Sequence, residues 1–174
     1  MIRWREAYDR IKDLPQFVQY FKKDLPLGEF RFLAYSQRFD SVPGTATAGV
    51  LGIPVGPLAQ NFPSGAVILG ITAAGYQAQQ SAAAAAYPPS LSAGRRDLFA
   101  LSFQYSGAEQ ITANGLTMAE PLLGSGYDTI FPAKEILIPP SQAILCAVAT
   151  LTPNTLPAIS VVVVYHCMVP RNAN

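Results

Sequence analysis

The stretch from Ile159 to Val169 reads ISVVVVYHCMV, and it decides the fold class. Its run of consecutive valines favours an extended strand, because branched side chains pack well on a pleated surface and lose rotamer freedom in a helix. Apolar residues occupy both faces of that strand, since neighbouring side chains point to opposite sides. We therefore expect a strand buried on both faces, either sandwiched inside the protein or covered by a partner.

Segments of the same extended character precede this strand at intervals of roughly ten residues, with Pro, Gly and Asn-Gly turn signals between them. Asp97–Tyr105 is the clearest, because every second residue from Phe99 onward is aromatic or aliphatic. The expected strands are Phe30–Phe39, Ala66–Tyr76, Asp97–Tyr105, Glu109–Thr112, Ile130–Phe131, Glu135–Ile138, Gln142–Thr150 and Ile159–Val169. About eight short strands with turns between them predict a mainly β protein, an antiparallel sandwich or a barrel.

Two segments do not follow this pattern. Ser41–Gly65 is interrupted throughout by proline and glycine, which exclude a helix and make a long strand unexpected. Gln77–Ala86 (QAQQSAAAAA) is of low complexity and is ended at once by Tyr87 and two prolines. Because an isolated helix of this length is marginal in water, we expect a loop with at most one helical turn, lying against another surface.

Residues 1–28 predict an amphipathic helical arm, followed by the β domain over residues 29–174. Apolar residues recur at helical spacing, while both signs of charge occupy the other faces. Pro15 fits the first turn of a second short helix, which would run to about Lys23, with Pro26 and Gly28 as stop signals. The apolar face either folds back on the same subunit or anchors to a neighbouring one. The candidate anchoring residues are Trp4, Tyr8, Ile11, Phe17, Val18 and Phe21.

Charge is scarce and unevenly distributed. Charged residues make up 13% of the chain, against about 25% in an ordinary soluble domain. More than half of them lie in residues 1–40, and none occurs in Ser41–Gly94 or Ile136–Pro170. We infer that much of the surface is covered by copies of the chain or by partners, the alternative being an uncharged domain solvated by Ser, Thr, Gln and Asn. Arg95 and Arg96 end the longest charge-free stretch, where they either bridge to an acidic patch on a partner or keep a strand start soluble.

The residues that carry chemistry are few. A single histidine, His166, excludes metal sites that need two imidazoles, and its place in the strongest strand predicts a hydrogen-bonded structural role. Cys146 and Cys167 lie in apolar strands, where free cysteines act as small buried hydrophobes, and a disulfide requires that their strands be neighbours. The sequence holds no nucleophile elbow and no phosphate-binding loop. We therefore expect no enzyme activity, no cofactor and no metal site.

The charge balance also bears on partners. A formal net charge of +1 provides no field that would steer the protein onto nucleic acid or an anionic membrane. The longest apolar runs, Ala143–Leu151 and Val161–Tyr165, are shorter than the roughly 18 residues of a membrane-spanning helix. The mixed charges near the N-terminus predict no secretory leader. We therefore expect synthesis in a cytoplasm and partners that are neither nucleic acid nor membrane.

The order of these features resembles the jelly-roll virion proteins of tailed bacteriophages, which decorate or cement the head or build collar and neck structures. The resemblance covers about residues 29 to 170 and rests on Ile111–Leu116, Pro121–Gly124, Phe131–Pro132, Ile138–Ser141 and the closing Val169–Pro170. It implies a self-associating jelly roll of about eight strands, often trimeric, attached to the major capsid protein or another virion protein. A helical arm is not general in that group, so the resemblance does not imply how the arm docks.

The leading hypothesis is therefore a non-enzymatic virion structural protein, made in the host cytoplasm, that most simply decorates or cements a capsid. A collar, neck or tail protein of the virion is the nearest alternative. A different class is a carbohydrate-binding sandwich that uses exposed aromatics as sugar platforms, with candidates Tyr76, Tyr87, Tyr105 and Tyr127. A third is a hydrolase resting on Glu120 and Asp128, although acids beside turns are usually just solvated.

Overall fold

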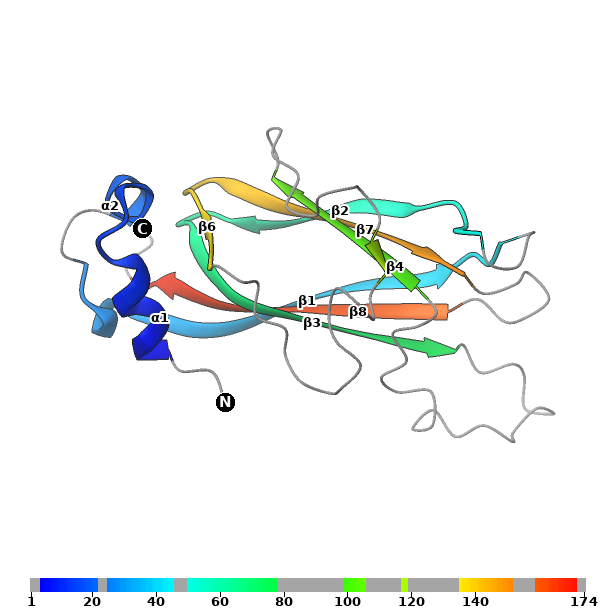
Figure 1. The fold of residues 1–174 in the computed structure, drawn as a ribbon, viewed down its shortest axis with the longest axis horizontal. Helices are drawn as coiled ribbons and strands as arrows, with labels where there is room; N and C mark the ends of the chain where they lie inside the picture. Colours follow the sequence, from blue (N-terminus) through cyan, green and yellow to red (C-terminus); the bar gives the residue numbers. More distant parts are fainter. Residues whose placement is uncertain are drawn as a thin grey trace.

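The computed structural model describes residues 4–21, 25–45, 50–77, 99–105, 117–118, 135–151 and 159–171, and these form short helices and two β-sheets (Figure 1). The helices are α1 (Trp4–Ile11), α2 (Pro15–Phe21) and the 3-10 helix η1 (Leu27–Glu29). The strands are β1 (Phe30–Val42), β2 (Val55–Phe62), β3 (Ala66–Gln77), β4 (Phe99–Tyr105), β5 (Thr117–Met118), β6 (Ile136–Ile138), β7 (Gln142–Thr150) and β8 (Ile159–Pro170).

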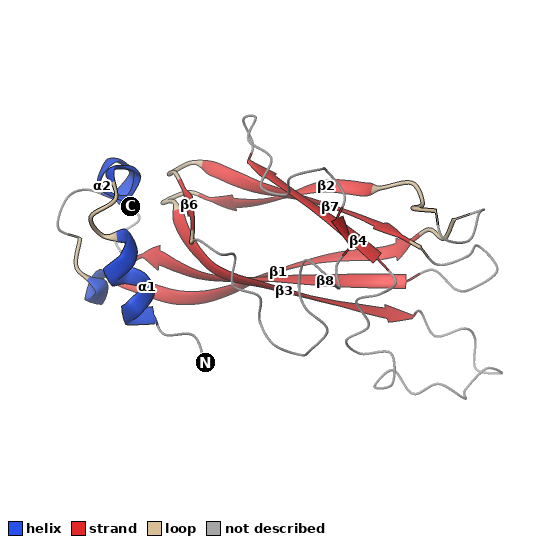
Figure 2. Ribbon diagram, in the orientation of Figure 1, coloured by secondary structure: helices blue, strands red, loops and turns tan. Residues whose placement is uncertain are grey.

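The strands lie in two facing antiparallel sheets, with the helices at one end (Figure 2). One sheet has the order β1-β8-β3-β6 and the other the order β2-β7-β4-β5. Strand β1 pairs with β8, β2 with β7, β3 with β6 and β4 with β5, so the chain resembles one long paired ribbon that has been folded over. Pairing of β3 with β8 and of β4 with β7 completes each sheet. The prediction of a mainly β protein is confirmed, and the two layers are consistent with a β-sandwich.

Strand β8 lies at the centre of the first sheet and explains why its sequence is so apolar. Its odd-numbered residues face the second sheet and are buried, among them Val161, Val163 and Tyr165. Its even-numbered residues Val162 and Val164 lie on the outer face and are only half-buried. The sequence predicted burial on both faces, whereas one face is fully buried within the chain and the other is covered in part.

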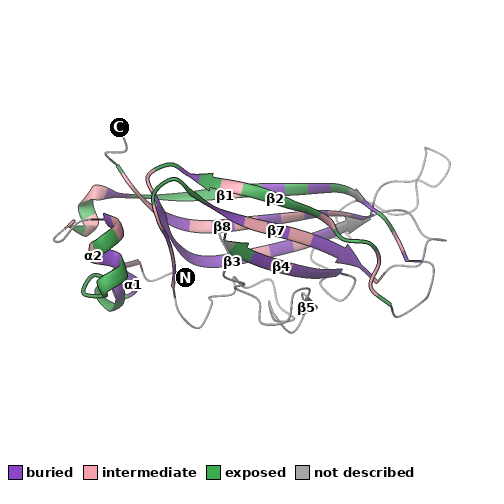
Figure 3. Ribbon diagram, turned by 90° about the horizontal axis from the view of Figure 1, so that it is seen from above, coloured by how far each residue is buried: buried purple, intermediate pink, exposed green. Residues whose placement is uncertain are grey.

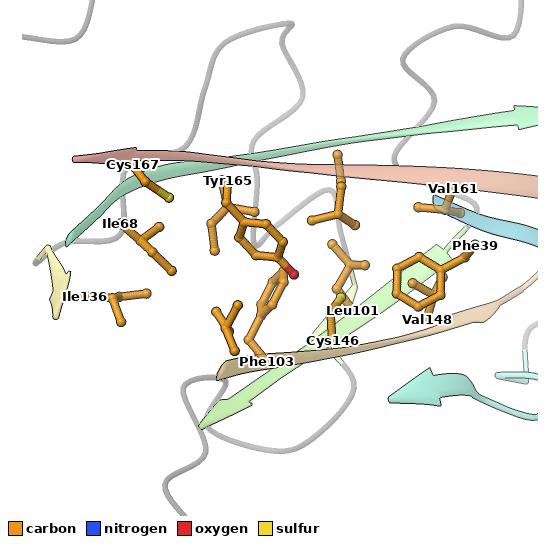
Figure 4. Packing of buried hydrophobic residues seen from close by; sticks show 14 of the residues in the cluster. Phe39, Ile68, Leu101, Phe103, Ile136, Cys146, Val148, Val161, Tyr165 and Cys167 are labelled. Carbon is orange, nitrogen blue, oxygen red and sulfur yellow. The ribbon is translucent and has the colours of Figure 1, made fainter. Parts of the chain in front are cut away.

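The core between the sheets is closed by side chains from β4, β7 and β8 (Figure 4). The period-two pattern of β4 is confirmed, since Phe99, Leu101 and Phe103 are all buried in this core. The rings of Phe103 and Tyr165 meet edge to face across the two sheets, with their centroids 6.2 Å apart. This arrangement suits the quadrupoles of the two rings and ties the sheets together at their centre.

A short chain of hydrogen bonds satisfies the polar atoms inside this core. The Tyr165 hydroxyl donates to Gln37 Oε1 over 2.7 Å, and Gln37 Nε2 donates to the Leu58 carbonyl over 3.2 Å. The bonds therefore join β8, β1 and β2. Because an unpaired buried hydroxyl or amide would cost about 1–3 kcal/mol, these partners make the burial of Tyr165 tolerable.

The segment Ser41–Gly65 departs from the sequence prediction, because it contains β2. Pro57 did not prevent this strand, since β2 is at the edge of its sheet and its pairing with β7 is interrupted between Val55 and Leu58. A proline at such a position has no ladder hydrogen bond to donate. Strand β5 was not predicted, and the expected strands Glu109–Thr112 and Ile130–Phe131 lie outside the described residues, as do residues 78–86.

The turn between β2 and β3 depends on Gly65. Its φ is +74°, in the left-handed region that favours glycine. A Cβ at this position would lie 2.7 Å from the Ile138 carbonyl oxygen and 2.9 Å from Cε1 of Phe21. Gly65 therefore allows β3, the β6 end and α2 to approach one another closely.

Replacing this glycine should be costly. We expect Gly65→Ala to lower the free energy of unfolding by about 1–3 kcal/mol, because the left-handed backbone and two close neighbours both oppose a side chain. Gly28→Ala is the matched control, since a Cβ at Gly28 meets no atom within 4 Å, and it should change stability by less than about 0.5 kcal/mol. Urea unfolding measures both variants, and equal stabilities would contradict the close approach at Gly65.

Candidate functional site

The two N-terminal helices lie at one end of the strands (Figure 3). They pack on the face of the first sheet that points away from the core between the sheets. Their buried residues form one hydrophobic cluster with residues of β1, β3 and β8. From the helices the cluster takes Ala7, Ile11, Phe17 and Phe21, and from the strands it takes Phe30, Val67, Leu69 and Met168. The apolar face of the arm is therefore satisfied within its own chain.

Phe30 is the centre of this cluster. Its ring centroid lies 6.3 Å from that of Tyr8, 6.0 Å from Phe17 and 5.9 Å from Phe21. Aromatic pairs of this kind each contribute about 0.5–1.5 kcal/mol beyond the area that they bury. Since Phe30 is the first residue of β1, these contacts fix both helices to the start of the first strand.

Two polar contacts orient α1 in addition to its hydrophobic packing. The Tyr8 hydroxyl donates to the Leu25 carbonyl over 2.7 Å. Arg10 forms an ion pair with Glu135, which directly precedes β6, and this partner raises the pKa of the Arg10 guanidinium. The arginine is mostly exposed, so we expect the pair to orient α1 rather than to stabilise it strongly.

The sequence left open whether the arm folds back or anchors to a neighbour, and the structure shows the folded-back arrangement. Ile11, Phe17 and Phe21 are buried in their own chain, so in this arrangement they do not provide an anchoring face for a neighbouring subunit. Trp4, Tyr8 and Val18 are half-buried.

The helical spacing of Trp4, Tyr8 and Ile11 does not continue to Val18, because α1 ends at Ile11 and α2 begins at Pro15. The turn after α1 breaks the helical period, and in α2 the residues that pack on the sheet are Phe17 and Phe21.

One edge of the arm leaves aromatic surface accessible. The rings of Trp4 and Phe32 are tilted against each other with centroids 4.2 Å apart. Phe32 and its neighbour Leu33 are nevertheless exposed, by 41% and 40%. The sequence did not single out Phe32, because the alternation along β1 does not indicate which part of the strand the helices cover.

Beyond the arm, the outer face of β8 and β3 carries small or branched side chains without charge, and the edge strand β1 adds Arg38 and Asp40. Cross-strand pairing places Ser36, Val164 and Thr72 in one row. The next row consists of Arg38, Val162 and Ala74. Of these, Val162, Val164, Thr72 and Ala74 are half-buried, and Ser36 and Arg38 are exposed.

A pair of opposite charges borders this outer face on β1. Arg38 Nε lies 2.6 Å from Asp40 Oδ1, and both side chains are largely exposed, at 68% and 60%. The Ser160 hydroxyl donates to the same carboxylate oxygen over 3.1 Å. The border of the face is therefore polar and carries no net charge.

His166 and Cys167 lie on opposite faces of β8, and Cys146 belongs to β7 in the other sheet. Cys167 faces the core, whereas its neighbour His166 is half-buried on the outer face, with Nε2 3.4 Å from Thr72 Oγ1. Burial lowers the pKa of His166, which favours the neutral imidazole. Cys146 and Cys167 are buried free thiols, and burial raises the pKa of each to about 12. They do not form a disulfide, and neither thiol is ionised at neutral pH.

Several candidate residues cannot be placed. Arg95, Arg96, Tyr87, Tyr127, Glu120 and Asp128 lie outside the described residues. Tyr76 and Tyr105 belong to β3 and β4, but their side chains are not described. Within the described ranges, no three His, Cys, Asp or Glu side chains gather where they could hold a metal ion. No helix among those ranges is long and apolar enough to span a bilayer.

Comparisons with protein-family models, with curated proteins and with solved structures found no match to this chain. Its function has therefore to be argued from its own fold and surfaces.

The folded-back arm can be tested by removing one aromatic side chain. Phe17→Ala should lower the free energy of unfolding by about 3–5 kcal/mol, because it empties the space between α2 and Phe30. Gln16→Ala is the control, since Gln16 is exposed one position earlier, and it should cost less than about 0.5 kcal/mol. Chemical unfolding at several protein concentrations should give the same difference throughout. A difference that changes on dilution would mean that the arm packs on another chain.

Proposed function

We propose that this chain is a non-enzymatic structural protein of a virus particle, most specifically a jelly-roll protein of a tailed bacteriophage. In this role it associates with copies of itself and attaches to the major capsid protein or another virion protein. Decoration or cementing of the capsid is the leading form of the proposal, and a place in the collar, neck or tail is the alternative form. The resemblance noted in the sequence implies a trimer as the usual order of self-association.

The order of the strands is the observation that carries the proposal. In a jelly roll, a ribbon of paired strands folds over so that the two sheets take the orders 1-8-3-6 and 2-7-4-5. The strands described here pair in those orders. Viral capsid proteins are a major class of jelly rolls, although lectins and cupins share the architecture. Because one fold serves many functions, the surface has to discriminate between these classes.

The accessible surface favours protein contacts. Val50, Ile53 and Leu58 are exposed by 53%, 78% and 41%, in the charge-free stretch that leads into the edge strand β2. Where exposed apolar side chains gather in one contiguous patch, they mark a place where another protein binds. The core of a protein–protein interface is also depleted of charge, and so is the part of the outer face formed by Val162, Val164, Thr72 and Ala74.

The buried polar groups are consistent with a structural role. Both thiols and the Tyr165 hydroxyl lie inside the core, where burial raises the pKa of each. Tyr165 is held by Gln37, and the cysteines act as packing residues in the same cluster. Among the described groups, these three would be the first candidates for nucleophilic or proton-transfer chemistry. Their burial instead suits a role in core packing.

The proposal is tested by asking whether the protein is part of particles. Particles from the organism that makes the chain would be banded on a density gradient and digested for mass spectrometry. We expect peptides of this chain to follow the major capsid protein across the gradient at a constant ratio, while an abundant soluble host protein does not. Recovery of the chain only in the soluble fraction would contradict the proposal.

A further inference from the structure

The outer face of β1, β8 and β3 has a polar border that is self-complementary. Arg38 and Asp40 point to the same side of β1, two residues apart, and are both largely exposed. If two such borders meet about a two-fold axis, the Arg38 of one copy can lie opposite the Asp40 of the other. The same two residues provide both halves of the contact.

The side chains behind this border suit close packing of two sheets. Val162, Val164 and Ala74 are small or branched, and Ser36 and Thr72 carry only hydroxyls. Sheets pack face to face at about 10 Å when such side chains interdigitate. Both valines are already half-buried, so covering them removes the remaining apolar surface from water without burying a charge.

From these observations we infer that a second copy of this chain packs on the outer face of β1, β8 and β3, over Val162 and Val164 and bordered by Arg38 and Asp40. The inference rests on the proposed function and specifies its self-association. A self-complementary patch gives a two-fold contact, so the basic unit is a dimer rather than the trimer that the resemblance implies.

The size of the face sets the expected strength. Residues 34–40 of β1 and the neighbouring strands span roughly 20 Å by 15 Å, from the rise per residue and the spacing between strands. This is roughly 300 Å² of sheet, against about 800 Å² for each partner of a typical stable complex. We therefore expect a weak dimer in dilute solution, which a high local concentration on a particle would strengthen.

A pair of lysine variants tests the location of this contact. Val164→Lys places a charge in the centre of the face and should raise the dimer dissociation constant at least about tenfold. Gln104→Lys adds the same charge at an exposed strand position of β4 in the second sheet, and it should leave the dissociation constant within about twofold. Sedimentation equilibrium up to several hundred micromolar measures association, and thermal unfolding verifies that both variants fold.

A charge exchange tests the two-fold arrangement. Arg38→Asp and Asp40→Arg each place like charges opposite one another across the axis and should weaken the dimer. The double variant R38D/D40R restores opposite charges and should recover most of the wild-type association.

Three results would overturn the inference: a wild-type chain that stays monomeric at every concentration, a trimer, or weakening by Gln104→Lys and not by Val164→Lys. None of these would exclude the chain from particles, which the gradient experiment decides separately.

Discussion

The burial of the inner face of β8 is the interaction on which the rest of the structure depends. Val161, Val163 and Tyr165 are completely inaccessible to solvent, and the backbone of the strand pairs with β1 on one side and β3 on the other. Each of these residues therefore contributes apolar burial and cross-strand contacts at once. Tyr165 adds a hydrogen bond to Gln37 and an aromatic contact with Phe103, so the same strand fixes the spacing between the sheets.

The alternation of the strand links this stability to the proposed function. Because neighbouring residues point to opposite faces, a continuous run of valines that fills the core must also place valines outside it. The N-terminal helices cover one end of that outer face through Phe30 and Met168. Val162 and Val164 lie beyond the helices and stay half-buried. A sequence that buries β8 so completely on one side thus also places a row of valines on the other.

The sequence predicted the regular strands closely and the surroundings of the arm poorly, for physical reasons. Gln142–Thr150 and the start at Ile159 agree with β7 and β8, because long apolar or alternating runs permit few other structures. The sequence does not predict β2, because proline and glycine usually interrupt a strand, although an edge strand tolerates them. An amphipathic pattern shows that one face of the arm is buried but not what buries it, so the packing of Phe17 on Phe30 required the structure. A local sequence pattern also does not indicate which strands pair, so the pairing of β8 with both β1 and β3 required the structure.

Native-state hydrogen exchange, followed residue by residue, tests the central role of β8 most directly. If the rest of the fold depends on this strand, the amides of Val161, Val163 and Tyr165 should be among the slowest to exchange, with a free energy of opening equal to that of global unfolding. The edge strands β2 and β6 should open at lower free energy, because each is paired on one side only. Amides of β8 that exchange faster than those of the edge strands, through local opening, would contradict this account.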